Sequence, residues 1–188
     1  NFYVWDMATN TVTDKSLSCI FFPSDVAVNP VNPDEIFVAQ QYSTSDWYQN
    51  NVVKYTHSTG NCEVFIPHPI GTHGNKKGIA MTRDGSYIIV CWQNNCAEYD
   101  SNGVQKWTQT YSSNVDNPFG AVYDASGLNA YVSGYNHAGQ QSQIRKFSIS
   151  SDHTSASWQL IFTSSTTGVD DSRFNHIEIS PDDNYLYI

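Results

Sequence analysis

The stretch TRDGSYIIV, residues 82–90, decides the fold of this chain, because SPDDNYLYI at 180–188 repeats its pattern. Both stretches place a polar turn containing aspartate before an apolar, aromatic-containing run of the length of a short strand. Related copies begin at residues 25, 78, 120 and 176, so they follow one another at intervals of 42 to 56 residues. Self-similarity at such an interval predicts a repeat architecture built from β-strands.

A second recurring element fills the intervals between these copies. Residues 53–60, 97–103 and 144–150 each carry a strand-like run that leads into a turn, and residues 3–10 repeat it once more. A further alternating run, such as residues 104–107, follows the turn. Together the elements give four short strands per unit, which we name A to D in chain order. Four hairpin-linked strands form a propeller blade, so the predicted fold class is an all-β β-propeller.

The two quoted stretches resemble the strand A–B hairpin of YVTN, lactonase-like and NHL-type propellers. Trp5-Asp6 and Tyr99-Asp100 are similar to the end of strand C that these repeats share with WD-repeat proteins. The resemblance covers nearly the whole chain at the level of single blades. It implies the β-propeller fold but no particular activity, because one fold carries many functions.

The repeats divide the chain into three complete blades between two half-blades, all within a single β-propeller domain. The complete blades are expected at residues 23–75, 76–117 and 118–173, with strands C and D of a half-blade at 1–22 and strands A and B of another at 174–188. We expect part of a larger propeller. The alternative is a closed four-blade ring in which the half-blades pair and remove the free strand edges.

The composition bears on the classes of partner. The 188 residues carry a formal net charge of −9 at pH 7, and only 14% of them are charged. A negatively charged surface repels a phosphate backbone, so we expect no nucleic-acid partner. No apolar run reaches the about 18 residues that a membrane-spanning helix needs, so we expect no membrane insertion.

Four cysteines bear on the cellular compartment. Cys91 and Cys96 flank the tip of a predicted hairpin, where cysteines on facing strands can meet the geometry of a disulfide. Cys19 and Cys62 are then available for a second bond. Disulfides would indicate an extracellular or cell-surface protein. The alternative is that the cysteines are small buried apolar side chains in a reducing compartment.

The D–A and B–C loops of a propeller gather around one mouth of the central channel, where we look for a metal site. The carboxylate and amide oxygens of Asp25, Asn117 and Asn175 can together hold Ca²⁺. The alternative is that these side chains cap turns. Beyond Ca²⁺ we expect no cofactor.

The same mouth carries the candidate catalytic residues. His73 and His176 can act as general bases, and Arg173 is the arginine nearest to this mouth. The alternative for both histidines is a structural role, His176 packed near the axis and His73 in a polar loop.

Aromatic and amide side chains of the B–C loops form the predicted ligand-binding surface. Sugars stack their apolar faces on aromatic rings while their hydroxyl groups bond to amides. The candidates are Trp47, Tyr48, Trp92, Gln93, Asn136 and His137. The alternative for Trp47 and Trp92 is ordinary packing between blades.

These observations favour a non-enzymatic extracellular module that binds a protein or glycan partner, or that assembles through free strand edges. The resemblance leaves open a lactonase or gluconolactonase-like hydrolase with its site at the channel mouth. A second alternative is an intracellular scaffold of the WD-repeat type.

Overall fold

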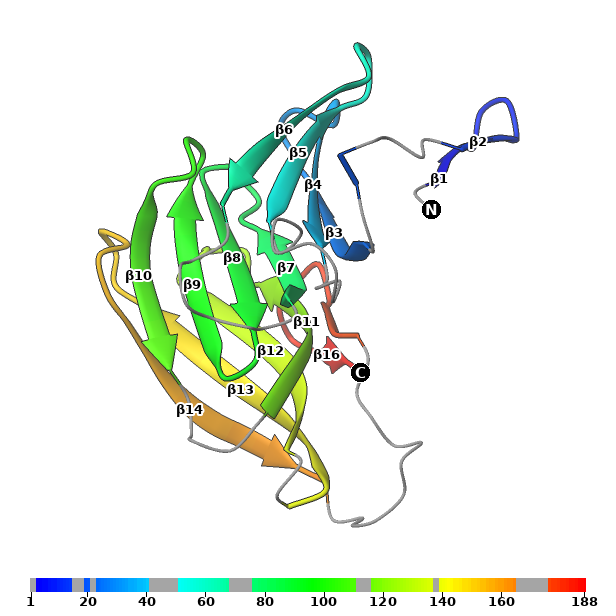
Figure 1. Ribbon diagram of the computed structural model, residues 1–188. Coiled ribbons are helices and arrows are strands. Elements are labelled where there is room, and N and C mark those ends of the chain that lie inside the picture. The colour runs from blue at the N-terminus through cyan, green and yellow to red at the C-terminus, as the bar shows by residue number, and fades with distance from the viewer. Residues whose placement is uncertain are drawn as a thin grey trace, which may run out of the picture.

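The computed structural model describes residues 3–14, 19–20, 23–40, 51–67, 76–110, 116–136, 139–164 and 176–188, without the side chains of 76–77 and 116–117. Strands and turns make up these ranges (Figure 1). None of the described segments forms a helix that is long and apolar enough to cross a membrane.

Three antiparallel sheets of four strands form the body of the molecule. The first contains β3 (Pro23–Val28), β4 (Glu35–Gln40), β5 (Val52–Thr56) and β6 (Asn61–Ile66). The second contains β7 (Lys76–Met81), β8 (Tyr87–Trp92), β9 (Asn95–Asp100) and β10 (Gln105–Thr110). The third contains β11 (Asp116–Tyr123), β12 (Asn129–Asn136), β13 (Gln141–Ile149) and β14 (Ala156–Thr163). The strands of each sheet follow chain order, as strands A to D of a blade should.

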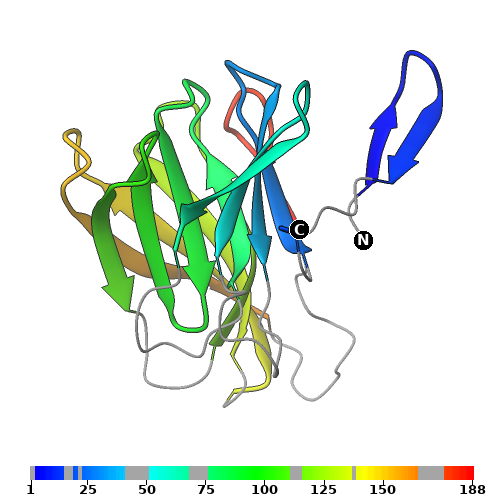
Figure 2. The same cartoon turned by 45° about the horizontal axis from the view of Figure 1, so that its top comes forward.

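Two hairpins accompany these sheets. One joins β1 (Tyr3–Asp6) to β2 (Thr11–Asp14), and the other joins β15 (Glu178–Ile179) to β16 (Leu186–Tyr187). The β1–β2 hairpin projects away from the three sheets, with His57 of the β5–β6 turn beside it, whereas β15 lies beside β11 (Figures 1 and 2). The sheets do not close into a ring, so the closed four-blade alternative is wrong. The predicted all-β arrangement of three four-stranded sheets and two half-sized ones is confirmed.

The first strand of each unit lies innermost, where the sheets approach one another. β3 packs beside β7, β7 beside β11, and β11 beside β15. Glycines permit this approach: a Cβ on Gly78 would lie 3.3 Å from the carbonyl carbon of Gly120, and a Cβ on Gly120 would lie 3.1 Å from the backbone nitrogen of Ile177. A larger side chain at either position would push two inner strands apart.

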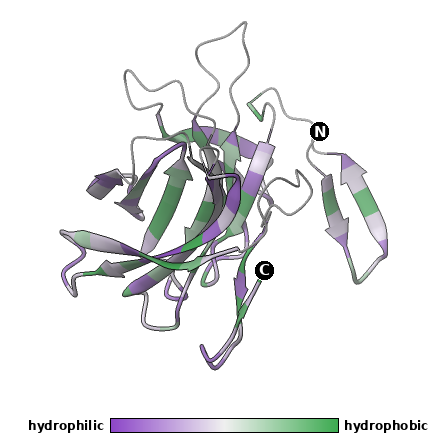
Figure 3. Ribbon diagram, turned by 90° about the horizontal axis from the view of Figure 1, so that it is seen from below, coloured by the Kyte–Doolittle hydropathy of each residue, from purple (hydrophilic) through white to green (hydrophobic). Residues whose placement is uncertain are grey.

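Apolar side chains fill the space between neighbouring sheets. The ribbon coloured by hydropathy shows hydrophobic residues along the strands of these sheets (Figure 3). The core between the first and second sheets includes Phe37, Val52, Ile88, Val90 and Trp92. The core between the second and third includes Ile89, Trp107, Tyr123, Val132 and Phe147. Because a sheet covers each face of β8, this strand is buried along nearly its whole length, which explains its unbroken apolar run.

Both candidate disulfides are present. Cys91 and Cys96 face each other across β8 and β9. Cys19 is bonded to Cys62 in β6 and closes a loop with a sequence separation of 43. The reduced-cysteine alternative therefore does not describe this structure, which holds no free cysteine among its described residues.

Candidate functional site

The predicted channel-mouth residues fall largely on parts of the chain that the structure does not describe. The residues in question are Trp47, Tyr48, His73, His137, Arg173 and Asn175. Asn117 lies in β11, but its side chain is likewise outside the described part. Their predicted roles remain predictions, and only Asp25, Trp92, Gln93, Asn136 and His176 can be located in full.

Trp92 differs from Gln93 and Asn136 in its exposure, since it is buried and they are half-buried. Trp92 is only 4% exposed and packs in the core between the first and second sheets. In this position its ring offers no free face to a sugar, and the packing alternative describes its environment. Gln93 occupies the β8–β9 turn with a φ of 47°, and the side-chain oxygen of Asn136 accepts a hydrogen bond from the backbone N–H of Gly139.

Asp25 and His176 come within electrostatic reach of each other at the inner strands. The Asp25 carboxylate accepts hydrogen bonds from the backbone N–H groups of Ile79 and Val26, each at 3.0 Å. Burial raises its pKa to about 6, and the charge of His176 acts in the opposite direction. His176 Nε2 lies 2.8 Å from the Glu178 carboxylate. The bond to Ile79 ties β3 to β7, which is a structural role for the predicted metal ligand.

The metal prediction gains no support from this arrangement. Among the described side chains, no group of three or more histidines, cysteines or carboxylates is placed to hold an ion. Two of the three predicted ligands, Asn117 and Asn175, lie outside the described side chains. Ca²⁺ binding therefore remains a prediction.

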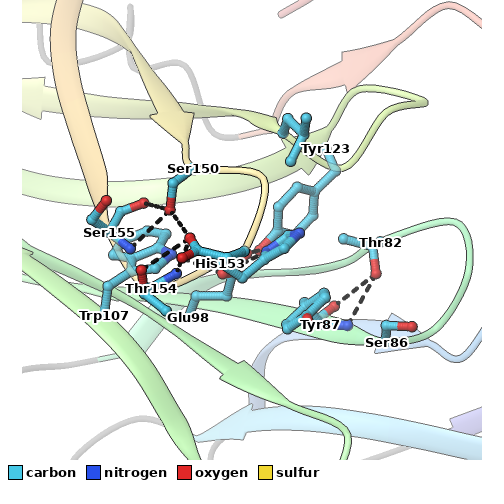
Figure 4. Close-up of polar contacts among 12 residues, drawn as sticks. Thr82, Ser86, Tyr87, Glu98, Trp107, Tyr123, Ser150, His153, Thr154 and Ser155 are labelled. Carbon is cyan, nitrogen blue, oxygen red and sulfur yellow. Dashed lines mark hydrogen bonds and ion pairs between the residues drawn. The ribbon is translucent and has the colours of Figure 1, made fainter.

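A buried carboxylate that sequence analysis missed is the centre of a polar network between the second and third sheets (Figure 4). Glu98 in β9 is fully buried. One of its oxygens accepts a hydrogen bond from Trp107 Nε1 at 2.8 Å and lies 2.9 Å from His153 Nδ1, and the other accepts from the Tyr123 hydroxyl at 2.7 Å. Three donors thus compensate a charge that would otherwise be costly to bury.

The partners of Glu98 come from both sheets. Trp107 belongs to β10 of the second sheet, while Tyr123 ends β11 and His153 sits in the β13–β14 turn of the third. Burial and the neighbouring Glu98 charge raise the pKa of Tyr123 well above its ordinary value, so this phenol stays protonated and remains a donor. The network therefore fixes the third sheet against the second.

His153 links this network to the surface. It has a left-handed backbone with a φ of 55°, is 8% exposed, and stacks on Tyr87 with the ring centroids 3.7 Å apart and the planes 5° from parallel. A left-handed histidine is uncommon and needs surrounding contacts to hold it. Here the contacts to Glu98 and Tyr87 supply that support.

A cavity of about 320 Å³ opens beside this stack. The A–B turn of the second sheet contributes Thr82, Arg83, Asp84 and Tyr87 to its wall, and the third sheet contributes residues 125–127 and His153. The A–B and C–D turns of the sheets lie together at one end of the molecule, uppermost in Figure 2. The sequence predicted a site at the opposite end, where the D–A and B–C loops of a propeller lie, so the cavity beside Tyr87 was not predicted.

Arg83 and Asp183 bridge the turns around the cavity. Arg83 Nη2 lies 2.8 Å from one oxygen of Asp183, and the other oxygen accepts a hydrogen bond from the backbone N–H of Ala125 at 2.8 Å. Asp183 precedes β16, so one carboxylate connects the A–B turns of three successive units. The cavity wall is thereby held by contacts between turns and by the core beneath.

One sequence signal pointed to the network. Glu98 lies between Ala97 and Tyr99 in a strand whose neighbours suggest burial on both faces. A charged residue in such a strand must find partners inside the protein. The partners themselves lie 9, 25 and 55 residues away, so no local motif could name them.

No family model matches the sequence, and no curated protein matches it either. Solved structures do match. Hydrazine synthase from Kuenenia stuttgartiensis superposes with a TM-score of 0.61 at 16% identity, over 93% of this chain and 44% of that chain. Hsv2 from Kluyvelomyces marxianus gives a TM-score of 0.48 at 11% identity, over 76% of this chain and 46% of that one.

The fold is that of a β-propeller. The match to hydrazine synthase carries this conclusion, and at 16% identity it concerns the fold alone. The chain spans less than half the length of either matched structure. The likeness does not separate YVTN or NHL-type blades from other propeller blades.

Proposed function

We propose that this protein is a non-catalytic extracellular binding module, built from blades of the YVTN or NHL type, that takes a protein or glycan partner. The observation that supports this proposal is the role of three carboxylates in joining neighbouring units of the fold. Asp25, Glu98 and Asp183 each accept hydrogen bonds that connect neighbouring sheets. Acids that a hydrolase would need for proton transfer here connect neighbouring units, while an open cavity lies between three turns of the second and third sheets.

The two disulfides support the extracellular part of the proposal. Disulfides persist in oxidising compartments and are rare in the cytosol. Thiol titration of the natively produced protein, denatured without reductant, should find no free thiol. Four titratable thiols would overturn the extracellular location and favour the intracellular scaffold of the WD-repeat type.

The binding role is testable with arrays of immobilised glycans and peptides. We expect saturable binding that Tyr87→Ala weakens at least fivefold, because this substitution removes half of the aromatic stack at the cavity. Tyr185→Ala is the matched control, since Tyr185 holds the equivalent position of the last repeat and is exposed. Equal loss in both variants, or no binding to any array member, would contradict the proposed site.

A lactonase-type hydrolase is the second candidate, and Asp25 is the observation that favours it. A carboxyl group with a pKa of about 6 near His176 suits general acid–base chemistry near neutral pH. Hydrolysis of a lactone panel, followed with and without a Ca²⁺ chelator, tests this candidate. Turnover above the buffer rate that Asp25→Asn abolishes would replace the binding proposal with the hydrolase.

A further inference from the structure

The cavity beside Tyr87 presents hydrogen-bond acceptors that the protein itself does not use. His153 lines it, and His153 Nε2 has no partner among the described residues. The Tyr87 hydroxyl likewise has no described partner, although its ring stacks on His153. Polar groups that line a cavity and have no hydrogen-bond partner within the protein are groups that a ligand can engage.

Glu98 decides which role the histidine plays. Both Glu98 oxygens receive hydrogen bonds, one from the Trp107 N–H and the other from the Tyr123 hydroxyl, so we assign the carboxylate as the acceptor and Nδ1 of His153 as the donor between them. In the neutral ring, Nε2 is then an acceptor with a fixed orientation. A ligand that engages this nitrogen of the neutral ring must bring a donor.

The charges around the cavity select the kind of donor. Arg83, the one arginine or lysine in the wall, is already paired with Asp183. The hydroxyl of Thr82 donates to Asp84 at 2.6 Å and lowers the pKa of that carboxyl, so Asp84 stays ionised. The protein as a whole carries a net charge of −9. With Arg83 paired to Asp183, Asp84 is the charged lining side chain that remains to act on a ligand, and a carboxylate beside an aromatic stack favours a cation, which such rings also attract directly.

The size of the cavity sets the extent of the ligand. At about 320 Å³ it is at the small end of ligand sites, which start at roughly 300 Å³. One long side chain fits this space, whereas an oligosaccharide would extend well beyond it.

We propose that this cavity binds the charged end of a lysine or arginine side chain from a protein partner, with His153 Nε2 and Asp84 as acceptors and the Tyr87–His153 stack as the apolar wall. The inference rests on the proposed binding function and names the class of partner. It assigns His153 a ligand-facing role in addition to its contact with Glu98.

Titrations followed by amide chemical shifts of the ¹⁵N-labelled protein test the inference. The four compounds to compare are Nα-acetyl-lysine methylamide, Nα-acetyl-arginine methylamide, the neutral Nα-acetyl-norleucine methylamide, and methyl glucoside. We expect saturable shifts at residues 82–87 and 125–127 with the two basic compounds only. Their ratio of affinities distinguishes the ammonium from the guanidinium group.

A pair of matched variants separates the charge from the fold of the turn. Asp84→Asn keeps an oxygen for the Thr82 hydroxyl and should weaken binding of the basic compounds at least fivefold. Asp182→Asn is the control, because Ser180 donates to Asp182 at the same 2.6 Å in a turn that does not line the cavity. Its affinity should stay within twofold of wild type.

The possible outcomes test the preference for cations separately from the proposed binding function. If methyl glucoside or the norleucine compound moves the same amides as well as the basic compounds do, the cavity binds ligands but has no preference for cations. That result overturns the inference and leaves the binding function in place. If none of the four compounds shifts these amides, the inference is overturned, and the glycan and peptide arrays alone then test the binding function. Equal losses in Asp84→Asn and Asp182→Asn also overturn it.

Discussion

The two junctions between the complete sheets are built differently. The first and second sheets meet through a core that includes Phe37, Ile88 and Trp92, and Asp25 is joined to β7 at its inner margin. The second and third sheets meet through a similar apolar core, but they also enclose Glu98 with its three donors. An apolar core tolerates small shifts of one sheet on another, because its contacts have no fixed direction. A buried carboxylate with its hydrogen bonds fixes the position of one sheet relative to the other. The cavity beside Tyr87 lies next to this second junction.

The largest effect should come from breaking the polar junction. Glu98→Ala leaves the buried donors of Trp107 and Tyr123 without an acceptor, so the free energy of unfolding should fall by about 3–5 kcal/mol. Urea unfolding followed by tryptophan fluorescence measures this. A loss below about 1 kcal/mol would mean that the network contributes no more than a surface contact.

Breaking the apolar junction should cost somewhat less. Ile88 is fully buried in the core between the first two sheets, and Ile88→Ala should lower the free energy of unfolding by about 3 kcal/mol, through lost burial and the cavity left behind. The shifts at residues 82–87 on adding the lysine compound should persist in this variant and disappear in Glu98→Ala. Loss of binding in both variants would contradict the conclusion that only the second junction positions the cavity.

A pH titration should sharpen the comparison at Asp25. Burial raises the pKa of Asp25 from 3.8 to about 6, so the folded state holds this proton more tightly than the unfolded chain. The stability that it contributes is complete below about pH 3.8 and is lost as the pH rises through about 6. Between about pH 4 and 7, wild type should therefore lose roughly 2 kcal/mol relative to Asp25→Asn. Parallel pH profiles of the two proteins in urea unfolding would contradict the raised pKa.

The smallest effect is expected at the bridge between the turns. Arg83 and Asp183 are both partly exposed, so Arg83→Ala should lower the free energy of unfolding by less than about 1 kcal/mol. Lys54→Ala is the comparable variant, because it removes the ion-pair partner of Glu63 in the first sheet. Thermal unfolding at low and high salt should show both small effects shrinking as salt increases.

The architecture could be predicted because each blade is specified by a short stretch of sequence, and that stretch recurs along the chain. The stretch 82–90 contains its own turn, its own strand and the spacing to the next copy, and the hairpin at Cys91 and Cys96 follows it directly. Each of these features depends on residues close together in the chain. The hairpin strands and their order within each sheet were accordingly predicted, and Cys91 and Cys96 were recognised as a candidate pair.

The network and its cavity could not be predicted, because they depend on where distant side chains converge. Glu98 and His153 are 55 residues apart, and His153 stands in a Ser-Asp-His-Thr turn that reads as an ordinary solvated loop. Trp92 shows a related limit: the sequence left both ligand binding and packing between blades open for this residue, and in the structure it lies in the core. Burial of a residue at the end of a strand is set by the neighbouring sheet, which its own sequence does not contain.

The bond between Cys19 and Cys62 gives the molecule an uneven response to mechanical tension. Three of the four strands of the first sheet, β3, β4 and β5, lie inside the loop that this bond closes. Pulling on the chain from outside the loop can peel the later sheets, but the enclosed 43-residue span transmits the load through sulfur and does not lengthen. At about 3.6 Å per residue, roughly 150 Å of contour length stays hidden until a reductant releases it. For a protein exposed to shear, this part of the molecule would be the last to extend.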